Sequence, residues 1–392
     1  MADVTDLPLY SSRLELSRDA LQNNIQFLRT RAGKGVTFSS VIKGNAYGHG
    51  IATFLPMAEE CGVSHFSVFS SEEAVAALEA KLNPETRIMI MGMVDDAALG
   101  WAIEHEVSFY IFDMGRLLAA RNAAERAGKP ARIHIQLETG MHRLGFLESE
   151  YEELIRFLKE NHGSIVVEGV CTHFAGAESV ANYVRIRSQQ KRFRKGVKAF
   201  QKVFPEIPYI HAASSAALLA YPDHLYSMVR VGIAQYGFWP SREVYMLLQK
   251  ENDLKVKDPL KRVIRWSSKI MSLKSVGEGE FVGYGTMYMT TRRETIATVP
   301  IGYSHGFGRN LTNMGYVLVR GLRAPVVGLV NMNMLTIDVT DIPGVSRGDE
   351  VVIIGRQEEG EITVASFGEM SNNLNYEVLT RLPEGLPRSV VE

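Results

Sequence analysis

The chain has 392 residues, enough for two or three domains that each bury a hydrophobic core. Its 43 Lys and Arg residues balance 44 Asp and Glu residues, and a net charge of -1 gives no field that would attract nucleic acid or an anionic membrane. No apolar run approaches the ~20 residues that cross a bilayer, no secretory signal is visible, and only two cysteines, Cys61 and Cys171, are present. Composition therefore predicts a cytoplasmic protein that binds neither nucleic acid nor membrane.

Strand and helix patterns alternate along the first 240 residues. A short strand at 14–16 leads into a helix that Ser17 can cap, with apolar residues at helical spacing through Leu28. Eight candidate strands follow, separated by amphipathic helices such as 72–78 and 151–160: 37–43, 65–70, 87–91, 107–112, 131–138, 165–174, 209–212 and 228–231. Eight such units predict a (β/α)8 barrel, the TIM-like fold of the α/β class. The alternative, a doubly wound open sheet, usually has a glycine-rich turn after its first strand, and 44–50 lacks that glycine spacing.

The pattern changes after a charged stretch, 239–260, which has no clear strand pattern and is interpreted as a boundary. Beyond it lie short alternating strands with glycine turns, at 263–273, 295–300, 316–320, 324–330, 335–339 and 350–354. The predicted domains are therefore an N-terminal extension, 1–13, which can join the last domain, a barrel, 14–245, and a mostly β domain, 246–392. The basic helix near 183–195 is interpreted as a solvated barrel helix, because total charge is balanced and no aromatic residues suited to base stacking are interleaved.

Lys43 stands at the point where an apolar strand meets a glycine-rich loop, 44–50. At the end of a half-buried strand, desolvation and nearby cations can lower the pKa of a lysine and free its amine for Schiff-base chemistry. For the Lys-Gly pair alone, an ordinary lysine beside a turn is the better interpretation.

Other polar residues fall at the carboxyl ends of the predicted strands, where barrels build their sites. His173 ends the sixth strand, Ser215 begins a helix after the seventh, and Arg230 and Gly232 lie at the end of the eighth. A hydroxyl at a helix start and a glycine that permits close approach suit an anion, and barrels commonly hold phosphate in these loops. Singly, His173 is explained as a core histidine and Ser215 as a helix cap; together they predict a phosphorylated ligand.

Ten residues around the lysine, Val41 to Gly50, resemble the cofactor-lysine segment of the alanine racemase family. Segments 139–146, 172–174, 214–217, 229–237, 281–288, 302–304 and 375–377 resemble its other motifs, so the resemblance extends from about 14 to 387. It implies pyridoxal 5'-phosphate (pyridoxal phosphate) on Lys43 as a Schiff base, and Tyr284 as a second base on the opposite face of the substrate. It also implies a homodimer whose shared active sites take the lysine from one subunit and the tyrosine from the other.

The resemblance assigns the remaining site residues. Phosphate ligands are Tyr47, Ser215, Gly232, Ile233 and Tyr376; Arg230 faces the pyridine nitrogen with His173 coupled to it; Arg143 binds the substrate carboxylate, and Tyr303 and Met332 lie at the substrate. An arginine disfavours protonation of the ring nitrogen, so the carbanion is short-lived and reprotonation is favoured over transamination. A tyrosine with a pKa near ~10 needs positive neighbours to act as a base, and His173 is the expected one.

Two positions depart from the family pattern. Many members carry a lysine, often carbamylated, where this chain has Gln136, and an acidic residue where it has Asn333. Both changes remove charge beside the substrate. The predicted function is interconversion of L- and D-alanine, supplying D-alanine for peptidoglycan.

Alternatives to that function are a racemase of other or more amino acids, a barrel decarboxylase, and a pyridoxal-phosphate-binding homeostasis protein. The homeostasis protein would lack the second domain. No metal site is predicted, because after Tyr226 the chain has no cysteine and only His305.

Overall fold

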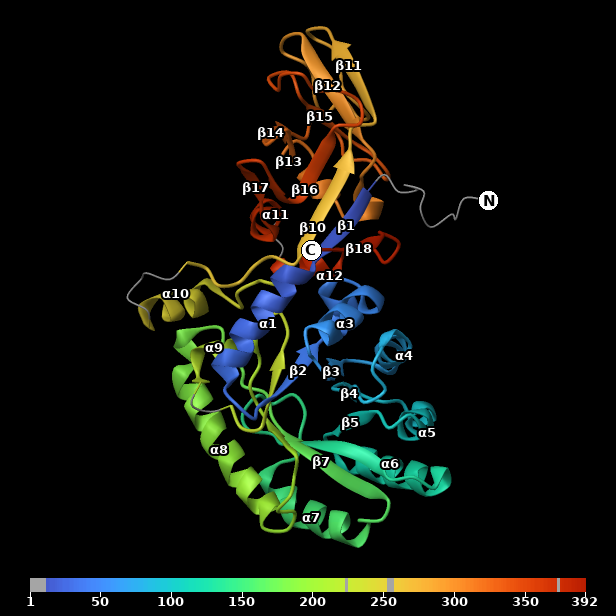
Figure 1. The fold of residues 1–392 in the computed structure, drawn as a ribbon, viewed down its shortest axis with the longest axis vertical. Coiled ribbons are helices and arrows are strands. Elements are labelled where there is room, and N and C mark those ends of the chain that lie inside the picture. The colour runs from blue at the N-terminus through green and yellow to red at the C-terminus, as the bar shows by residue number, and fades with distance from the viewer. Residues whose placement is uncertain (1–11, 223–224, 252–256, 372–373) are drawn as a thin grey trace. The chain divides into compact units, whose positions relative to one another are not determined.

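The computed structural model describes residues 12–222, 225–251, 257–371 and 374–392. Contacts group them into two compact units, a barrel unit with 19–46 and 54–261, and a second unit with 12–18, 47–53 and 262–392 (Figure 1). The predicted extension, 1–13, lies outside the described residues except for Ser12 and Arg13. The ranges 14–245 and 246–392 stay a prediction.

The first unit is a closed barrel of eight parallel strands, which confirms the predicted fold class. Its strands are β2 (Thr37–Val41), β3 (His65–Val68), β4 (Arg87–Ile90), β5 (Ser108–Ile111), β6 (Ala131–Gln136), β7 (Ile165–Cys171), β8 (Tyr209–His211) and β9 (Met228–Val231). β9 pairs with β2 and closes the ring. Most strands end before their predicted ends, because the following residues leave the ladder to form the loops of the carboxyl end.

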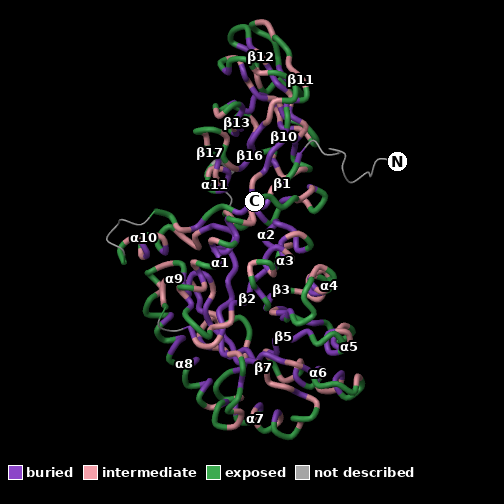
Figure 2. Tube along the Cα trace, in the orientation of Figure 1, coloured by how far each residue is buried: buried purple, intermediate pink, exposed green. Residues whose placement is uncertain are grey.

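Helices cover the outside of the barrel (Figure 1). They are α1 (Arg18–Ala32), α3 (Ile51–Glu60), α4 (Ser71–Ala80), α5 (Asp96–Glu104), α6 (Met114–Ala127), α7 (Tyr151–Glu160), α8 (Tyr183–Gln201), α9 (Ser215–Ala220) and α10 (Arg242–Glu251). α7 buries one stripe, with Tyr151, Leu154 and Leu158 at helical spacing, whereas the short α9 is buried at its first five residues. Figure 2 shows buried strands inside partly exposed helices. α10 lies in the charged stretch 239–260, for which the sequence predicted no helix.

The barrel interior is partly polar. Ser39, Ser67 and His65 are buried, the two hydroxyls are 2.5 Å apart, and Nδ1 of His65 lies 2.9 Å from the Ser39 hydroxyl. Burial lowers the pKa of His65 to about 4, with Arg87 adding to the shift. His65 is therefore neutral in the folded protein at neutral pH.

This buried histidine predicts a loss of stability in mild acid. The folded pKa of about 4 lies below the ordinary value of 6.5, so the stabilisation is present above pH 6.5 and is lost as pH falls toward 4. Between pH 7.5 and pH 5, His65 alone should remove about 2 kcal/mol from the free energy of unfolding. Urea unfolding at both pH values should show a drop that is smaller by that amount in His65→Phe. An equal drop in both proteins would contradict a neutral His65.

The second unit is mostly β, as predicted. One sheet has the order β14 (Leu322–Pro325), β13 (Tyr316–Val319), β16 (Glu350–Gln357), β10 (Ile264–Lys269), β1 (Ser12–Ser17), β18 (Arg388–Val391), with β17 (Gly360–Ile362) beside β16. A three-stranded sheet has the order β11 (Ser272–Val276), β12 (Glu294–Val299), β15 (Leu335–Asp338). β1 pairs antiparallel with β10 and parallel with β18, so the strand seen near Leu14 completes this sheet.

Three features of this unit differ from the sequence prediction. The predicted strand 263–273 is two strands in different sheets, because the chain turns at Ile270 and Met271, whose N–H groups donate to Asp349 and Thr298. The strand predicted at 324–330 ends at Pro325, which has no N–H to donate. Helices α11 (Val364–Ser371) and α12 (Asn375–Thr380) were not predicted. Within the described residues of the whole chain, no helix is long and apolar enough to cross a membrane.

Candidate active site

Lys43 begins a left-handed turn. The turn is α2 (Lys43–Tyr47), in which Gly44, Asn45 and Ala46 have φ values of 62°, 51° and 53°. Such a conformation costs about 1–2 kcal/mol for each residue other than glycine, so it needs outside support. Glu73 supplies it: its carboxylate accepts the N–H groups of Gly44 at 2.5 Å, Asn45 at 3.4 Å and Phe69 at 2.8 Å. The turn therefore fixes the backbone from which the Lys43 side chain extends.

The strand before Lys43 is bound to the loop after β9. The carbonyl of Val41 accepts hydrogen bonds from the Tyr236 hydroxyl at 2.9 Å and from the Gln235 amide at 3.1 Å. Ser40 donates to the carbonyl oxygen of the same amide at 2.8 Å. These bonds join the first strand of the barrel to the loop after the last strand. They fix the position of the Lys43 backbone relative to that loop.

Five charged or titratable residues influence one another at this end of the barrel. The Lys43 side chain is exposed by accessible area, yet its amine is enclosed by protein on most sides, and this desolvation lowers its pKa. Arg143 and Arg230 lower it further, and Glu73 opposes them. Burial, with the charges of Arg230, Arg143 and Lys43, lowers the pKa of His173 to about 3. The arrangement suits a lysine that must act as a neutral amine, beside a neutral imidazole. The prediction that His173 is a positive neighbour for Tyr284 is wrong in its charge, because burial and the nearby cations keep the imidazole neutral.

Arg230 is buried and its guanidinium donates to three acceptors. They are Nδ1 of His211, the carbonyl of Thr172 at 2.8 Å and the carbonyl of Ala212 at 3.3 Å. The sequence predicts a pairing of Arg230 with His173. In the structure, Arg230 donates a hydrogen bond to His211 instead, the last residue of β8. His211 had the same signal as the other site residues, a polar side chain at a strand end.

The residues predicted to bind phosphate after β8 and β9 lie together. The hydroxyl of Ser215 accepts the N–H groups of Gly232 at 3.0 Å and Ala234 at 3.4 Å. Ser215 is the first residue of α9, and Ile233 is buried between Gly232 and Ala234. A hydroxyl and two backbone N–H groups thus lie together, and groups of these kinds are the donors that bind phosphate in proteins.

The loop that carries Arg143 is held by one carboxylate. Glu138 accepts the N–H groups of Gly140, of Met141 at 2.8 Å and of His142 at 2.9 Å. Arg143 itself is exposed. The amide of Gln136 donates to the carbonyl of Leu144, the residue after Arg143, at 3.4 Å.

In the second unit, two pairs of predicted site residues lie close together. The rings of Tyr47 and Tyr376 are 6.0 Å apart between centroids. The N–H of Tyr303 donates to Asn331 at 3.0 Å, and the next residue, Ser304, donates its hydroxyl to the carbonyl of Met332 at 2.7 Å. The two tyrosines predicted to bind phosphate therefore lie near each other, and so do the two residues predicted to lie at the substrate.

Tyr284 lies at the tip of a hairpin that Phe281 and Met289 close by a β-bridge. Gly283 and Gly285 flank it with φ values of 76° and 75°, a conformation that favours glycine. Its side chain is 73% exposed. Lys43 and Tyr284 belong to different units, and their pairing stays a prediction.

Across the described residues, no group of three or more His, Cys, Asp or Glu side chains could hold a metal ion.

Comparisons with known proteins agree with this arrangement. Residues 16–240 match the family "Alanine racemase, N-terminal domain", and residues 263–390 match "Alanine racemase, C-terminal domain". An alanine racemase of Leptospira interrogans is 33% identical over 98% of this chain and 96% of its own, and alanine racemase 1 of Caldanaerobacter subterraneus subsp. tengcongensis is 32% identical over 96% and 94%. The crystal structure of the Streptomyces lavendulae enzyme has a TM-score of 0.86 at 30% identity, covering 99% of this chain and 98% of that one. An alanine racemase of Bacillus anthracis with bound L-Ala-P gives 0.86 at 30% identity, over 98% and 96%.

The barrel, the mostly β second unit and these matches define an enzyme that racemises amino acids. The chain belongs to the alanine racemase family, and it is an amino-acid racemase.

Proposed function

We propose that this protein interconverts L- and D-alanine with pyridoxal phosphate as cofactor, using Lys43 and Tyr284 as two opposed bases. The observation that carries the proposal is the group at the barrel end, where an enclosed lysine with a lowered pKa stands with the buried Arg230. Membership of the family supplies the reaction class. The product, D-alanine, would serve peptidoglycan synthesis.

The residues present fit the cofactor. Ser215, Gly232 and Ile233 offer a hydroxyl and backbone N–H groups for the phosphate, and Tyr47 and Tyr376 offer phenol hydroxyls from the second unit. Lys43 offers an amine for a Schiff base, and Arg230 and His173 would bind beside the ring. When bound, the cofactor would supply an electron sink that acidifies the α-hydrogen of the amino acid.

The protein's own groups would then move one proton across the substrate. The amine of Lys43 takes or returns it on one face, and the phenol oxygen of Tyr284 does so on the other. Arg143 binds the substrate carboxylate, with Tyr303 and Met332 beside the substrate. The guanidinium of Arg230, which can only donate hydrogen bonds, would disfavour protonation of the ring nitrogen and would so favour racemisation over transamination.

The test is racemisation of a panel of amino acids, followed by chiral separation of the products and by assay for released CO2. We expect alanine to be the fastest substrate. Gln136 and Asn333 are uncharged at positions where many family members carry a charge near the substrate. This difference favours, as a second candidate function, a racemase of other or more amino acids. CO2 release without racemisation would identify a decarboxylase and refute the proposal.

Gln136 predicts that activity does not depend on bicarbonate, because an amide cannot form a carbamate. We expect equal rates in degassed buffer and in buffer with added bicarbonate. Gln136→Lys should either keep that rate or acquire a bicarbonate dependence, since its amine can be carbamylated. A wild-type rate that rises severalfold with bicarbonate would contradict the prediction.

We also propose a homodimer with shared active sites. Exposed apolar side chains gather on the loops that carry Tyr284 and Met332, which supports contact with a second copy of the chain: Phe281, Met287, Met289 and Met334. Neither Cys61 nor Cys171 is in a disulfide, which supports a cytoplasmic location. Balanced charge favours a small amino acid as the partner of the site, rather than nucleic acid or membrane.

A further inference from the structure

A line of buried polar side chains crosses the barrel interior from Arg230. Nη1 of Arg230 bonds Nδ1 of His211, and Nε2 of His211 lies 2.8 Å from Nδ1 of His134 on β6. Nε2 of His134 faces the carboxylate of Glu168 on β7 at 3.9 Å. Both histidines are fully buried. The line joins a residue of the candidate site to a carboxylate that lies beyond two imidazole rings.

The chemistry of the first bond fixes the protons of the whole line. A guanidinium can only donate, so Nδ1 of His211 must be an acceptor. The proton of neutral His211 is then on Nε2, which donates to Nδ1 of His134. His134 in turn carries its proton on Nε2, which faces Glu168 at 3.9 Å, too far for a hydrogen bond, and has no other hydrogen-bond partner among the described residues. Neither ring can become cationic without breaking a bond of the line, and burial lowers the pKa of both.

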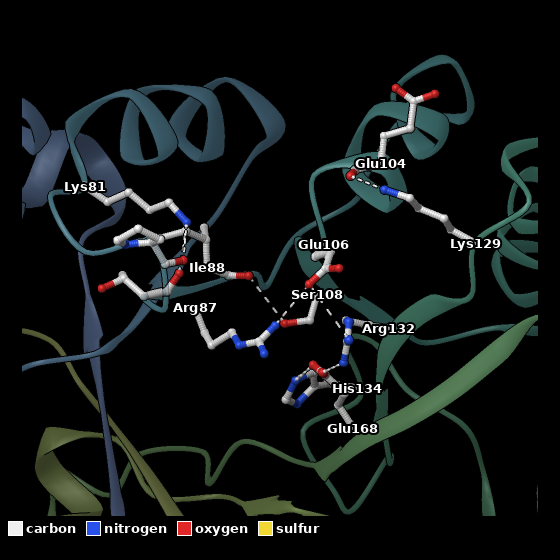
Figure 3. A network of polar contacts seen from close by, with 12 residues as sticks. Lys81, Arg87, Ile88, Glu104, Glu106, Ser108, Lys129, Arg132, His134 and Glu168 are labelled. Atoms are coloured by element: carbon white, nitrogen blue, oxygen red, sulfur yellow. Dashed lines mark hydrogen bonds and ion pairs between the residues drawn. The ribbon is translucent and has the colours of Figure 1, made fainter.

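Glu168 ends the line in a network of ion pairs (Figure 3). Arg132 binds Glu168 at 2.7 Å and approaches Glu106 at 3.9 Å, and Glu106 also pairs with Arg87 at 3.5 Å. Within the described residues, the guanidinium of Arg230 bonds an imidazole and two carbonyls but no carboxylate. Because a buried cation is costly without compensation, an oriented chain of dipoles that ends on a carboxylate is a source of stabilisation.

His134 is itself held in place by its surroundings. Its ring stacks on Tyr209 with centroids 5.8 Å apart and an angle of 8°. A methyl group at Gly169 would lie 2.1 Å from Nδ1 of His134, so a side chain there would displace the ring. The position of His134 is therefore set by packing, and the position of His211 follows from it.

We propose that His134 is a positioning residue for Arg230. By accepting the Nε2 proton of His211, it holds that imidazole as an acceptor for the guanidinium, and so keeps Arg230 aligned in the site. The part that concerns the cofactor ring rests on the proposed function; the part that concerns the hydrogen bonds does not.

The first experiment tests the hydrogen bonds without relying on activity. In protein with 15N-labelled histidine, long-range 1H–15N correlation spectra at pH 7 should show both His134 and His211 as neutral rings protonated at Nε2. The His211 Nε2 proton should exchange slowly with solvent. In His134→Phe it has no acceptor, and we expect its exchange to accelerate at least about 10-fold, the equivalent of one lost hydrogen bond. A cationic ring, an Nδ1 proton on either histidine, or unchanged exchange in the variant would overturn the proposal.

The second experiment measures the consequence for reaction choice. In His134→Phe we expect kcat for racemisation to fall about 10-fold with little change in KM, and the pyruvate formed per racemisation event to rise, because a misaligned Arg230 no longer keeps the ring nitrogen unprotonated. Pyruvate reports transamination, in which alanine loses its amino group to the cofactor. His134→Asn, whose amide oxygen can still accept from His211, should restore most of the wild-type ratio. A normal ratio in His134→Phe would overturn the positioning role.

His65→Phe is the matched control, because it also removes a buried imidazole near Tyr209. The imidazole of His65 bonds Ser39 and is not part of the line. We expect its pyruvate ratio to match wild type; a ratio raised as much as in His134→Phe would show a general packing effect and overturn the proposal. Should the wild-type protein racemise no amino acid, the proposed function fails, while the exchange of the His211 proton still decides the hydrogen-bond chain.

Discussion

The Lys43→Ala variant is expected to lose racemisation by at least about 10³-fold and to bind pyridoxal phosphate without a covalent bond. The amine of Lys43 would have two tasks, the Schiff base with the cofactor and proton transfer at the substrate. Its lowered pKa, caused first by desolvation and then by Arg143 and Arg230, suits both tasks at neutral pH. Borohydride reduction followed by peptide mapping of wild type should place the cofactor on Lys43.

Lys34→Ala is a suitable control for this experiment, because Lys34 is exposed and belongs to no part of the candidate site. It should keep the covalent cofactor and the activity. Added methylamine should return part of the activity to Lys43→Ala, since a small amine can replace the missing base. A reducible linkage on another lysine of the wild-type protein would refute the assignment of Lys43.

The barrel could be predicted because its signals are local. Each strand is a short apolar run followed by a helix with one apolar stripe, and eight repeats of that pattern leave few other architectures. The second unit depends on pairings between distant segments: β1, at residues 12–17, lies between β10 and β18. No local pattern reports such a neighbour, and the split of 263–273 into β10 and β11 depends on contacts with distant strands in the same way.

The sequence pointed to candidate site residues that lie at or after strand ends. It did not identify the residues that support them through side-chain contacts. Lys43, His173 and Ser215 follow the ends of strands, and Arg230 is the next-to-last residue of β9. The left-handed turn after Lys43 depends on Glu73, which looks in the sequence like an ordinary exposed residue of an amphipathic helix. The acceptor for Arg230 is His211, which only the register of neighbouring strands places within reach.

Refolding the Lys43→Ala and Tyr284→Phe variants together is expected to restore racemase activity, because mixed dimers form. Each variant alone should be nearly inactive, because each lacks one of the two bases. If the dimer takes Lys43 from one subunit and Tyr284 from the other, a mixed dimer has one site with both changes and one with neither. Random pairing makes half of the dimers mixed, and half of their sites intact, so unfolding and refolding the variants together should restore about a quarter of the wild-type activity.

The choice of Tyr284→Phe keeps the aromatic ring on its exposed hairpin and removes only the phenol oxygen, so the proposed packing of this ring against a second subunit would be preserved. Refolding each variant alone is the control and should restore nothing. Differently tagged subunits, purified through both tags, would establish that mixed dimers have formed, and these should have about half the wild-type activity per dimer. If both bases came from one chain, every site would keep one change whatever the mixture. Doubly tagged dimers without activity would therefore refute the shared site.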